Sequence, residues 1–346
     1  MKAMVIHAFG GPDVLSYETV PDPVPRHGEV RIEVHGATVN RVLDVAVRAG
    51  TQKQRGAQVP LILGVDCAGI VNAVGDGVTR WKIGDRVAAA GTMPLEICDE
   101  DARDYKGPRG MMGIRRPGGF AEMIAVPACA VVALPTGLGF HDAAVALRHL
   151  PTAWNLLCNE AQLAKGEWVL IMGAGGNLGT IGIQLAKNVI GARVITTAGS
   201  DERVRTGLAL GADYAINYRT HDLYDEVMKI TGGKGVDVLY DNIANPEVLP
   251  KAFRALGHGG RLVTAGAHGG PNVTIDFFHL YDRRITIRGM PGHRSEDVPK
   301  CFAAVADGKI KVQIAKILPL SQAAEAHRLI EANPGMGKIV LDPSLG

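Results

Sequence analysis

Apolar and polar positions alternate over short stretches in roughly the first 120 residues of the chain. In GEVRIEVHG, Val30, Ile32 and Val34 fall on one face, which is the two-residue period of a half-buried strand. Glycine and proline separate this stretch from others of the same kind, including AGIVNAVGDGV and GDRVAAAG. The pattern predicts an antiparallel, barrel-like domain.

From about Glu167 the pattern changes to strand, glycine turn and helix. WVLIM is an uninterrupted apolar run, as expected of a parallel strand covered on both faces. Leu178, Ile181 and Leu185 then follow at helical spacing, and Gly191 closes the segment. The unit repeats as far as RLVTAGA, which predicts a doubly wound parallel sheet. The last fifty residues need not belong to this sheet, and their return to the first domain is an open alternative.

The turn in LIMGAGGNLGTIGIQLAK has the context of a dinucleotide-binding fingerprint, because a buried strand precedes it and a helix follows it. Gly176 lets the backbone approach a pyrophosphate, and Gly179 lets the helix pack against the strand. Free N–H groups at the start of the helix attract phosphate charge. A structural turn without a ligand is the alternative interpretation.

The end of the second strand of this sheet indicates which nicotinamide cofactor fits. An NAD(H) enzyme usually carries an acid about 20 residues past the turn, where this chain has Gly199 and Ser200. Asp201 follows in the first helical turn, a common place for an acid that interacts with the helix dipole. Arg203 offers a guanidinium for a 2′-phosphate, and Tyr218 can cover the adenine. We therefore favour NADP(H) over NAD(H), with a solvated Arg203 as the alternative.

Composition and charge exclude several classes of function. The chain has 346 residues, enough for about two domains. Its formal charge of +2 includes no basic block, so nucleic acid is not an expected partner. The N-terminus resembles neither a signal peptide nor a membrane span, and we expect a cytoplasmic protein without a membrane partner. The five cysteines form no CxxC motif, and we interpret most of them as small core residues.

Several stretches, in order along the chain, carry a family resemblance: PLILGVDCAGIV, VGDGVTRWKIGDRV, GGFAEM, the glycine turn, LGADYAINY, GGRLVTAG and GKIVL. The chain resembles the medium-chain dehydrogenase/reductase superfamily, specifically its zinc-independent, quinone oxidoreductase-like branch. The resemblance implies an α/β protein with a GroES-like β-barrel catalytic domain, residues 1–150 and 291–346, around a Rossmann domain, residues 151–290. It also implies a cleft between the domains and a homodimer or homotetramer.

Zinc-dependent relatives use ligands that this chain lacks. Asn40 stands near their first cysteine, Val65 replaces their histidine, and LRHLPTAW offers no usual third ligand, whereas a catalytic zinc site needs three protein donors. The loop that holds structural zinc in those relatives keeps only Cys98. We therefore expect no metal; an unconventional site built from Asp66, Cys67 and His149 is the alternative.

Without a Lewis acid, the natural hydride acceptor is a quinone or an alkene conjugated to a carbonyl. The resemblance makes Asn40 the leading catalytic contact, with helix capping as its alternative role. His149 is the candidate proton donor, with a structural role as its alternative. Ala46 stands where many relatives carry a tyrosine, which removes a proton donor. The expected substrate-binding residues are Arg41, Asp44 and Asp66, and the expected cofactor-binding residues are Thr152, Gly176, Asn177, Leu178, Gly179, Ser200, Arg203, Tyr218, Asn242, Ala265 and Lys338.

Three functional hypotheses remain open from the sequence. The leading one is an NADPH-dependent reductase of quinones or α,β-unsaturated carbonyl compounds, acting on a small-molecule substrate without catalytic zinc. The second is an alcohol dehydrogenase or aldehyde reductase, and the third is a non-enzymatic NADPH-binding regulatory or structural protein. An edge strand in RRITIRG is the expected contact with a twin subunit.

Overall fold

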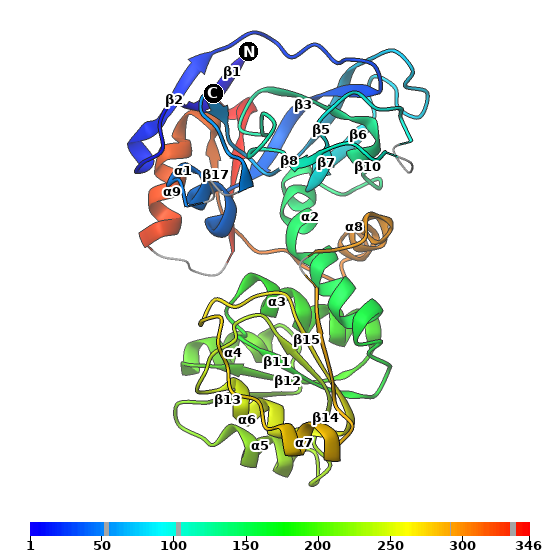
Figure 1. The fold of residues 1–346 in the computed structure, drawn as a ribbon, viewed down its shortest axis with the longest axis vertical. Helices are drawn as coiled ribbons and strands as arrows, with labels where there is room; N and C mark the ends of the chain where they lie inside the picture. Colours follow the sequence, from blue (N-terminus) through cyan, green and yellow to red (C-terminus); the bar gives the residue numbers. More distant parts are fainter. Residues whose placement is uncertain (52–54, 102–104, 291, 333–336) are drawn as a thin grey trace. The chain divides into compact units, whose positions relative to one another are not determined.

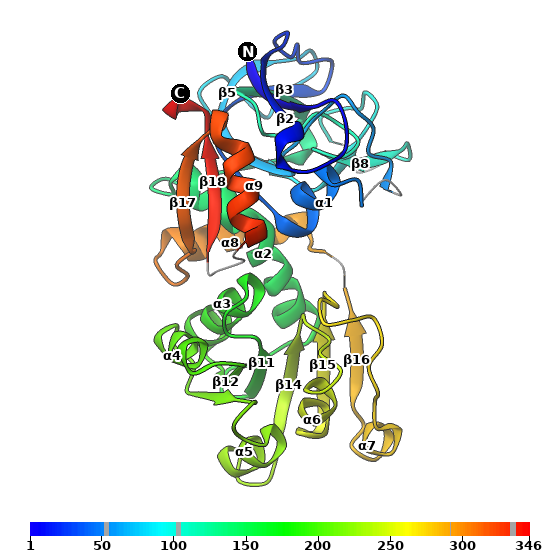
Figure 2. The ribbon, with the colours of Figure 1, turned by 90° about the vertical axis from the view of Figure 1, so that its left-hand side faces the viewer.

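The computed structural model describes residues 1–51, 55–101, 105–290, 292–332 and 337–346. Its contacts divide the chain into two compact units, Met1–Arg148 with Val312–Gly346, and His149–Lys311. Figures 1 and 2 show the ribbon in two views.

Unit 1 is built mainly from antiparallel strands. Its largest sheet has the order β10-β6-β5-β3-β18-β17, with β9 also paired to β3. A second sheet has the order β2-β1-β4, and β7 pairs with β8. All of these pairs are antiparallel except β17 with β18. The strands are β1 Lys2–Ile6, β2 Leu15–Thr19, β3 Glu29–Thr38, β4 Leu61–Ile62, β5 Asp66–Val74, β6 Arg86–Ala90, β7 Thr92–Pro94, β8 Arg109–Met111, β9 Met123–Pro127, β10 Val131–Ala133, β17 Ile314–Pro319 and β18 Lys338–Asp342.

The alternation in β3 has the predicted effect. Val30 and Ile32 are 0% exposed and Val34 is 2% exposed, and they join Leu63 and Phe120 in one apolar core. The helices of unit 1 are α1 Ala46–Arg48, the first part of α2 Phe140–Trp154, which continues into unit 2 from His149, and α9 Ala323–Ala332. Figure 2 shows α9 beside β17 and β18. The barrel-like antiparallel domain predicted from the sequence is confirmed.

The β7/β8 pair, on either side of the segment that contains Cys98, is tied to the rest of unit 1 by Arg116. Arg116 contacts the carboxylate of Glu29 at 2.5 Å and donates to the carbonyl of Pro94 at 2.6 Å. The Glu29 carboxylate also accepts from Arg26. Burial raises the pKa of Glu29, whereas its bonds to Arg26 and Arg116 lower it. The arginines have the larger effect, and the pKa is lowered to about 2.

Unit 2 is a parallel sheet of order β13-β12-β11-β14-β15-β16. Val169, Leu170 and Ile171 of β11 are all 0% exposed, which confirms a strand covered on both faces. The strands are β11 Trp168–Met172, β12 Arg193–Ala198, β13 Tyr214–Asn217, β14 Val236–Asp241, β15 Leu256–Thr264 and β16 Thr286–Gly289. The helices are α3 Asn177–Gln184, α4 Asp201–Ala209, α5 Leu223–Ile230, α6 Leu249–Arg254, α7 Phe277–Asp282 and α8 Val298–Ala306.

The end of the chain is divided between the two units. β18 pairs with β3, so the closing strand returns to unit 1. We also expected residues 291–311 to belong to unit 1, but the contacts assign the chain as far as Lys311, which includes α8, to unit 2. The reason is a set of polar contacts: Gln184 Nε2 donates to the Lys311 carbonyl, the Lys311 N–H donates to Gln184 Oε1, and Asn159 donates to Asp297.

None of the helices in the described ranges is long and apolar enough to cross a membrane.

Candidate active site and cofactor turn

The ends of β3 and β5 bring Thr38 and Asp66 together in unit 1. The N–H and hydroxyl of Thr38 donate to the two oxygens of Asp66, each at 2.7 Å. Asn40 Nδ2 donates to the same carboxylate at 3.0 Å and to the Thr38 hydroxyl at 3.1 Å. Thr38 and Asp66 are 0% exposed and Asn40 is 2% exposed, so these groups are satisfied by one another rather than by water.

Asp44 joins this network through a turn of π-helix over Arg41–Val45. The Val45 N–H donates to the Asn40 carbonyl at 3.2 Å, which closes the wider turn. The Asp44 carboxyl accepts from the backbone N–H groups of Asn40 at 2.8 Å and of Gly64 at 3.1 Å. Burial, and then the charge of Asp66, raises the pKa of Asp44 to about 7. Single π-helical turns are frequent at functional sites.

Lys338 supplies a buried cation to the same network. Its Nζ donates to Asn40 Oδ1 at 2.6 Å, and the residue is 5% exposed. Burial lowers the pKa of Lys338 to about 8, although Asp66 and Asp44 act in the opposite direction. The ammonium group of Lys338 thus holds the amide of Asn40, and its predicted contact with the cofactor stays a prediction. We refer to Thr38, Asn40, Asp44, Asp66 and Lys338 as the buried polar network.

This geometry bears on the residues predicted to contact substrate. The Asn40 side chain does not cap the helical turn, because Thr38 and Asp66 use its N–H groups and Lys338 uses its oxygen. Asp44 and Asp66 are 0% exposed. A direct substrate contact by these carboxyl groups does not fit their burial, whereas Arg41 is exposed.

The glycine turn of unit 2 has the close backbone packing that was predicted. A Cβ on Gly179 would lie 2.0 Å from the Gly173 carbonyl oxygen, and Gly173 itself has φ +83°. Gly176 precedes α3 without a side-chain cap, so the N–H groups of Asn177 and Leu178 begin the helix. The nearest atom to a Cβ on Gly176 would be the Gly173 carbonyl oxygen, at 3.7 Å. This leaves an open approach for an anion at the helix N-terminus.

Two arginines border the end of β12. The side chain of Arg203 lies against Gly175, where an added Cβ would be 2.8 Å from its Cδ. At Gly199 an added Cβ would be 2.6 Å from the Tyr218 hydroxyl and 3.3 Å from Arg219 Nε. Neither guanidinium forms an ion pair with a carboxylate in the described part of the chain. Sequence reasoning missed Arg219, although its place directly after Tyr218 at the end of a strand was a usable signal.

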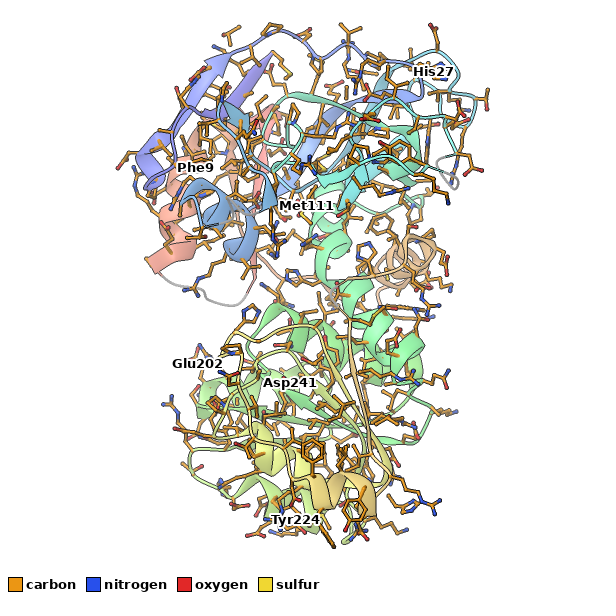
Figure 3. The ribbon with its side chains drawn as sticks, viewed as in Figure 1. Phe9, His27, Met111, Glu202, Tyr224 and Asp241 are labelled. Atoms are coloured by element: carbon orange, nitrogen blue, oxygen red, sulfur yellow. The ribbon has the colours of Figure 1, made fainter. Side chains whose placement is uncertain are left out.

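The acids at this edge are already engaged. Asp201 accepts from Asn217 Nδ2 at 2.7 Å, and Ser200 caps α4 by accepting from the Arg203 N–H at 3.4 Å. Figure 3 shows Glu202 on α4 and Asp241 at the end of β14. The Asp241 carboxylate accepts from two backbone N–H groups of the following loop, those of Ile243 and Ala244. Asp201 and Asp241 are therefore occupied by protein donors.

Asn242 follows β14 and differs from these acids. It is 8% exposed, and its Nδ2 makes no hydrogen bond of good geometry with a described residue, although its side chain faces the Tyr240 hydroxyl. A buried amide without a partner costs free energy unless a ligand or water satisfies it. Ala265 follows the next strand of the sheet, β15. A cavity of about 350 Å³ lies beside Tyr218, Arg219, Leu223, Asn245 and Val248. This end of the sheet offers donors and space to a nucleotide.

His149 and Thr152 lie on α2 within unit 2, and both are partly exposed. Their predicted contacts with substrate and nicotinamide stay predictions. Among the described residues, no three histidine, cysteine, aspartate or glutamate side chains are grouped to hold a metal ion. At two positions where zinc-dependent relatives carry ligands, Val65 offers no donor and the Asn40 amide is bonded to Thr38, Asp66 and Lys338.

Fold and turn together define a class, the two-domain nicotinamide-dependent oxidoreductases. Residues 26–136 match the family model of the alcohol dehydrogenase GroES-like domain, and residues 177–307 match that of the zinc-binding dehydrogenases. The chain is 32% identical to a quinone oxidoreductase of Sus scrofa, over 99% of this chain and 97% of the relative. It is also 32% identical to a 2-haloacrylate reductase of a Burkholderia species, over 99% of both chains.

Solved structures agree with these relatives. An NAD-dependent alcohol dehydrogenase has a TM-score of 0.87 and 35% identity, with 99% of each chain covered. A mycobacterial protein complexed with NADPH has a TM-score of 0.76 and 28% identity, with 99% of this chain and 100% of that chain covered. The chain belongs to the medium-chain dehydrogenase/reductase superfamily, in its quinone oxidoreductase-like branch, and is an NAD(P)H-dependent oxidoreductase.

Proposed function

We propose that the protein transfers hydride from NADPH to a quinone or an α,β-unsaturated carbonyl compound without catalytic zinc. The observation that carries the choice of cofactor is the pair Arg203 and Arg219 beside the end of β12. A guanidinium binds a phosphate with parallel hydrogen bonds, and the acid that would bind a ribose diol instead, Asp201, is bonded to Asn217.

The chain's residues fit this cofactor in several places. The N-terminus of α3 would hold the pyrophosphate, Gly176 would permit its close approach, and Gly179 lets the helix pack against the strand. The Nδ2 of Asn242 would donate to the cofactor. Tyr218 and the cavity beside it receive the adenosine end. When bound, the cofactor supplies a hydride from C4 of its reduced pyridine ring.

The chain then has to orient the acceptor and supply a proton. The buried polar network fixes the loop that begins at Asn40, and it leaves Arg41 exposed beside it. His149 is the proposed proton donor, because imidazole exchanges protons near neutral pH. Thr152 is proposed to contact the nicotinamide. The acceptor class is supported by the names of the relatives, which reduce quinones and 2-haloacrylate.

A panel of acceptors tests the proposal. We expect NADPH to be oxidised by quinones and enones, with kcat/KM unchanged after prolonged treatment with a chelator. The similarity to an alcohol dehydrogenase makes aldehyde reduction the second candidate function. Aldehyde turnover that a chelator abolishes and zinc restores would favour this second function and contradict the first.

We further propose that β16 pairs with β16 of a second copy. All of Thr286–Gly289 is exposed, and Ile287 is 45% exposed on a strand that β15 covers on one side. The neighbouring α7 exposes Phe277, Phe278 and Tyr281. An unpaired strand edge beside an apolar patch favours a symmetric contact. Light scattering on Ile287→Pro should show a smaller assembly than the parent protein shows, and an unchanged mass would contradict the proposal.

A further inference from the structure

The side chains of Cys98 and Cys129 interact with each other in unit 1. Cys98 belongs to the segment between β7 and β8, and Cys129 belongs to the short 3-10 turn Ala128–Ala130 between β9 and β10. Both side chains are partly exposed, whereas Cys67 and Cys301 are buried. We predicted from the sequence that most of the five cysteines are core residues, which is wrong, because Cys98, Cys129 and Cys158 are partly exposed.

Gly28 holds the two cysteine segments against one another. A Cβ on Gly28 would lie 1.9 Å from the Cys98 carbonyl oxygen, so the main chain of Cys98 packs directly onto this glycine. The carbonyl of Gly28 accepts from the Ala128 N–H at 2.9 Å, immediately before Cys129. Trp81 Nε1 donates to the Ala128 carbonyl at 3.1 Å and fixes the same turn.

The chain after Cys98 is anchored as well. One oxygen of the Glu100 carboxylate accepts from the Thr79 N–H at 3.1 Å and from the Thr79 hydroxyl at 2.8 Å. Asp99 lies 3.4 Å from Nε2 of His27, which Figure 3 labels. Backbone packing on Gly28 and these side-chain anchors hold the Cys98 and Cys129 segments beside one another, which is the arrangement that a disulfide bond between them requires.

We propose that Cys98 and Cys129 are a modification site, a dithiol that a low-molecular-weight disulfide converts into a disulfide bond between the two residues. One protein thiolate attacks a sulfur of the reagent, which releases one thiol and forms a mixed disulfide. The second protein thiolate then attacks the protein sulfur of that mixed disulfide and releases the other thiol. Two protein thiols are thereby oxidised by two electrons, and the reagent is reduced to two thiols.

The surroundings determine how fast this exchange runs. Burial raises the pKa of Cys98, and it raises the pKa of Cys129 to about 11. Arg116 opposes this effect at Cys98 and Arg109 opposes it at Cys129, while Asp99 and Glu29 add to it at Cys98. The thiolate is therefore scarce near neutral pH, and the rate of exchange should rise about tenfold per pH unit from pH 7 to 9.

Oxidised glutathione tests the proposal on the full-length protein. Peptide mapping under non-reducing conditions should find one cross-linked peptide pair that contains Cys98 and Cys129, with the intact mass lower by two hydrogens. The cross-link should raise the thermal unfolding temperature by several degrees, because it closes a long loop, and dithiothreitol should reverse both changes.

Cys98→Ser and Cys129→Ser should each abolish the cross-link. The matched control Cys158→Ser removes a partly exposed thiol from unit 2 and should leave the cross-link intact. If either unit 1 variant folds poorly, the corresponding alanine variant replaces it. Glutathione that remains on Cys98 or Cys129 of the parent protein as a mixed disulfide, or a cross-link through another cysteine, would overturn the proposal.

Discussion

The buried polar network of unit 1 and the glycine turn of unit 2 differ in whether their polar groups have hydrogen-bond partners within the protein. In the network, each named hydrogen bond joins two protein groups, from Thr38 and Asp66 to Lys338 and Asn40. Around the turn, the N-terminus of α3 has no side-chain cap, and Asn242 Nδ2 makes no hydrogen bond of good geometry with a described residue. Both regions were assigned to ligand contacts from sequence.

The difference separates residues that position a site from residues that bind a ligand. A buried polar group pays for its loss of hydration unless it finds a partner. Where protein groups supply the partners, as at Asn40, the side chain fixes the local fold. Where protein groups do not supply these partners, as we propose for Asn242 and Arg203, a bound ligand can form the hydrogen bond instead. Variants in the first region should therefore lower stability, and variants in the second should lower cofactor affinity.

The largest expected effect follows from removing the cation of the network. Lys338→Met leaves Asn40 Oδ1 without its donor, and it leaves Asp66 and Asp44 without the ammonium charge. Breaking a buried charged set by removing one partner costs about 3 to 5 kcal/mol. Urea unfolding followed by fluorescence should show this loss.

Lys316→Met is the matched control, because Lys316 is exposed on the neighbouring strand β17. It should change the unfolding free energy by less than about 0.5 kcal/mol. Equal losses in the two variants would show that the contact between Lys338 and Asn40 does not stabilise unit 1.

The next effect concerns the close packing of the turn. Gly179→Ala places a methyl group 2.0 Å from the Gly173 carbonyl oxygen, so the turn must shift. We expect a loss of about 1 to 3 kcal/mol in stability and, because the helix N-terminus moves from the pyrophosphate site, a Kd for NADPH raised more than tenfold. Fluorescence titration and thermal unfolding measure the two quantities.

Gly176→Ala separates packing from binding at the same turn. The nearest atom to its added methyl group is the Gly173 carbonyl oxygen, at 3.7 Å, so the unfolding temperature should stay near that of the parent. NADPH binding should weaken, because the methyl group would stand where the pyrophosphate approaches the backbone. A Gly176→Ala variant that binds NADPH normally would argue against a phosphate beside this residue.

The pKa of Asp44 predicts how stability depends on pH. Because burial raises this pKa to about 7, the folded protein holds a proton that the unfolded chain has lost above pH 4. The folded state binds more protons between pH 4 and 7, so the unfolding free energy falls as pH rises, by at most about 1.4 kcal/mol per unit. Lys338, with its pKa lowered to about 8, has the opposite effect from pH 8 to 10.

Urea unfolding from pH 5 to 7 checks this slope. Asp44→Asn removes the titrating group and should flatten the slope. Asp76→Asn changes an exposed acid of unit 1 and should leave it unchanged. The same slope in the parent and in Asp44→Asn would mean that Asp44 does not carry the proton.

Local patterns in the sequence were enough to predict most of the fold. The two-residue period of β3, the apolar run of β11 and the glycine turn each depend on neighbouring residues, and each appears where it was expected. The boundary between the units, expected near residue 291, was harder to predict from the sequence. It depends on contacts between residues far apart in the chain, such as those between Gln184 and Lys311.

Site residues were predicted less completely, for a physical reason. The motifs identified Asn40, Asp66 and Lys338, but period and spacing do not reveal which polar side chain is buried against which other. Lys338 was assigned to the cofactor, which stays a prediction, but its hydrogen bond to Asn40 was not predicted. The contact between Cys98 and Cys129 depends on how both segments pack on Gly28, and no local pattern encodes it.

The smallest expected effect is the sharpest test of the ligand-binding region. Arg203→Ala and Arg219→Ala should each raise the Kd for NADPH about tenfold, because each removes one charged hydrogen-bonding partner of the 2′-phosphate. The Kd for NADH should change less than twofold, since NADH lacks that phosphate. Arg205→Ala, on the same helix as Arg203, is the control for general loss of positive charge. If Arg205→Ala weakens NADPH binding as much as Arg203→Ala does, the arginines act through the overall field of the protein. A loss confined to Arg203 and Arg219 requires direct contact, because a screened field acts on neighbouring charges alike.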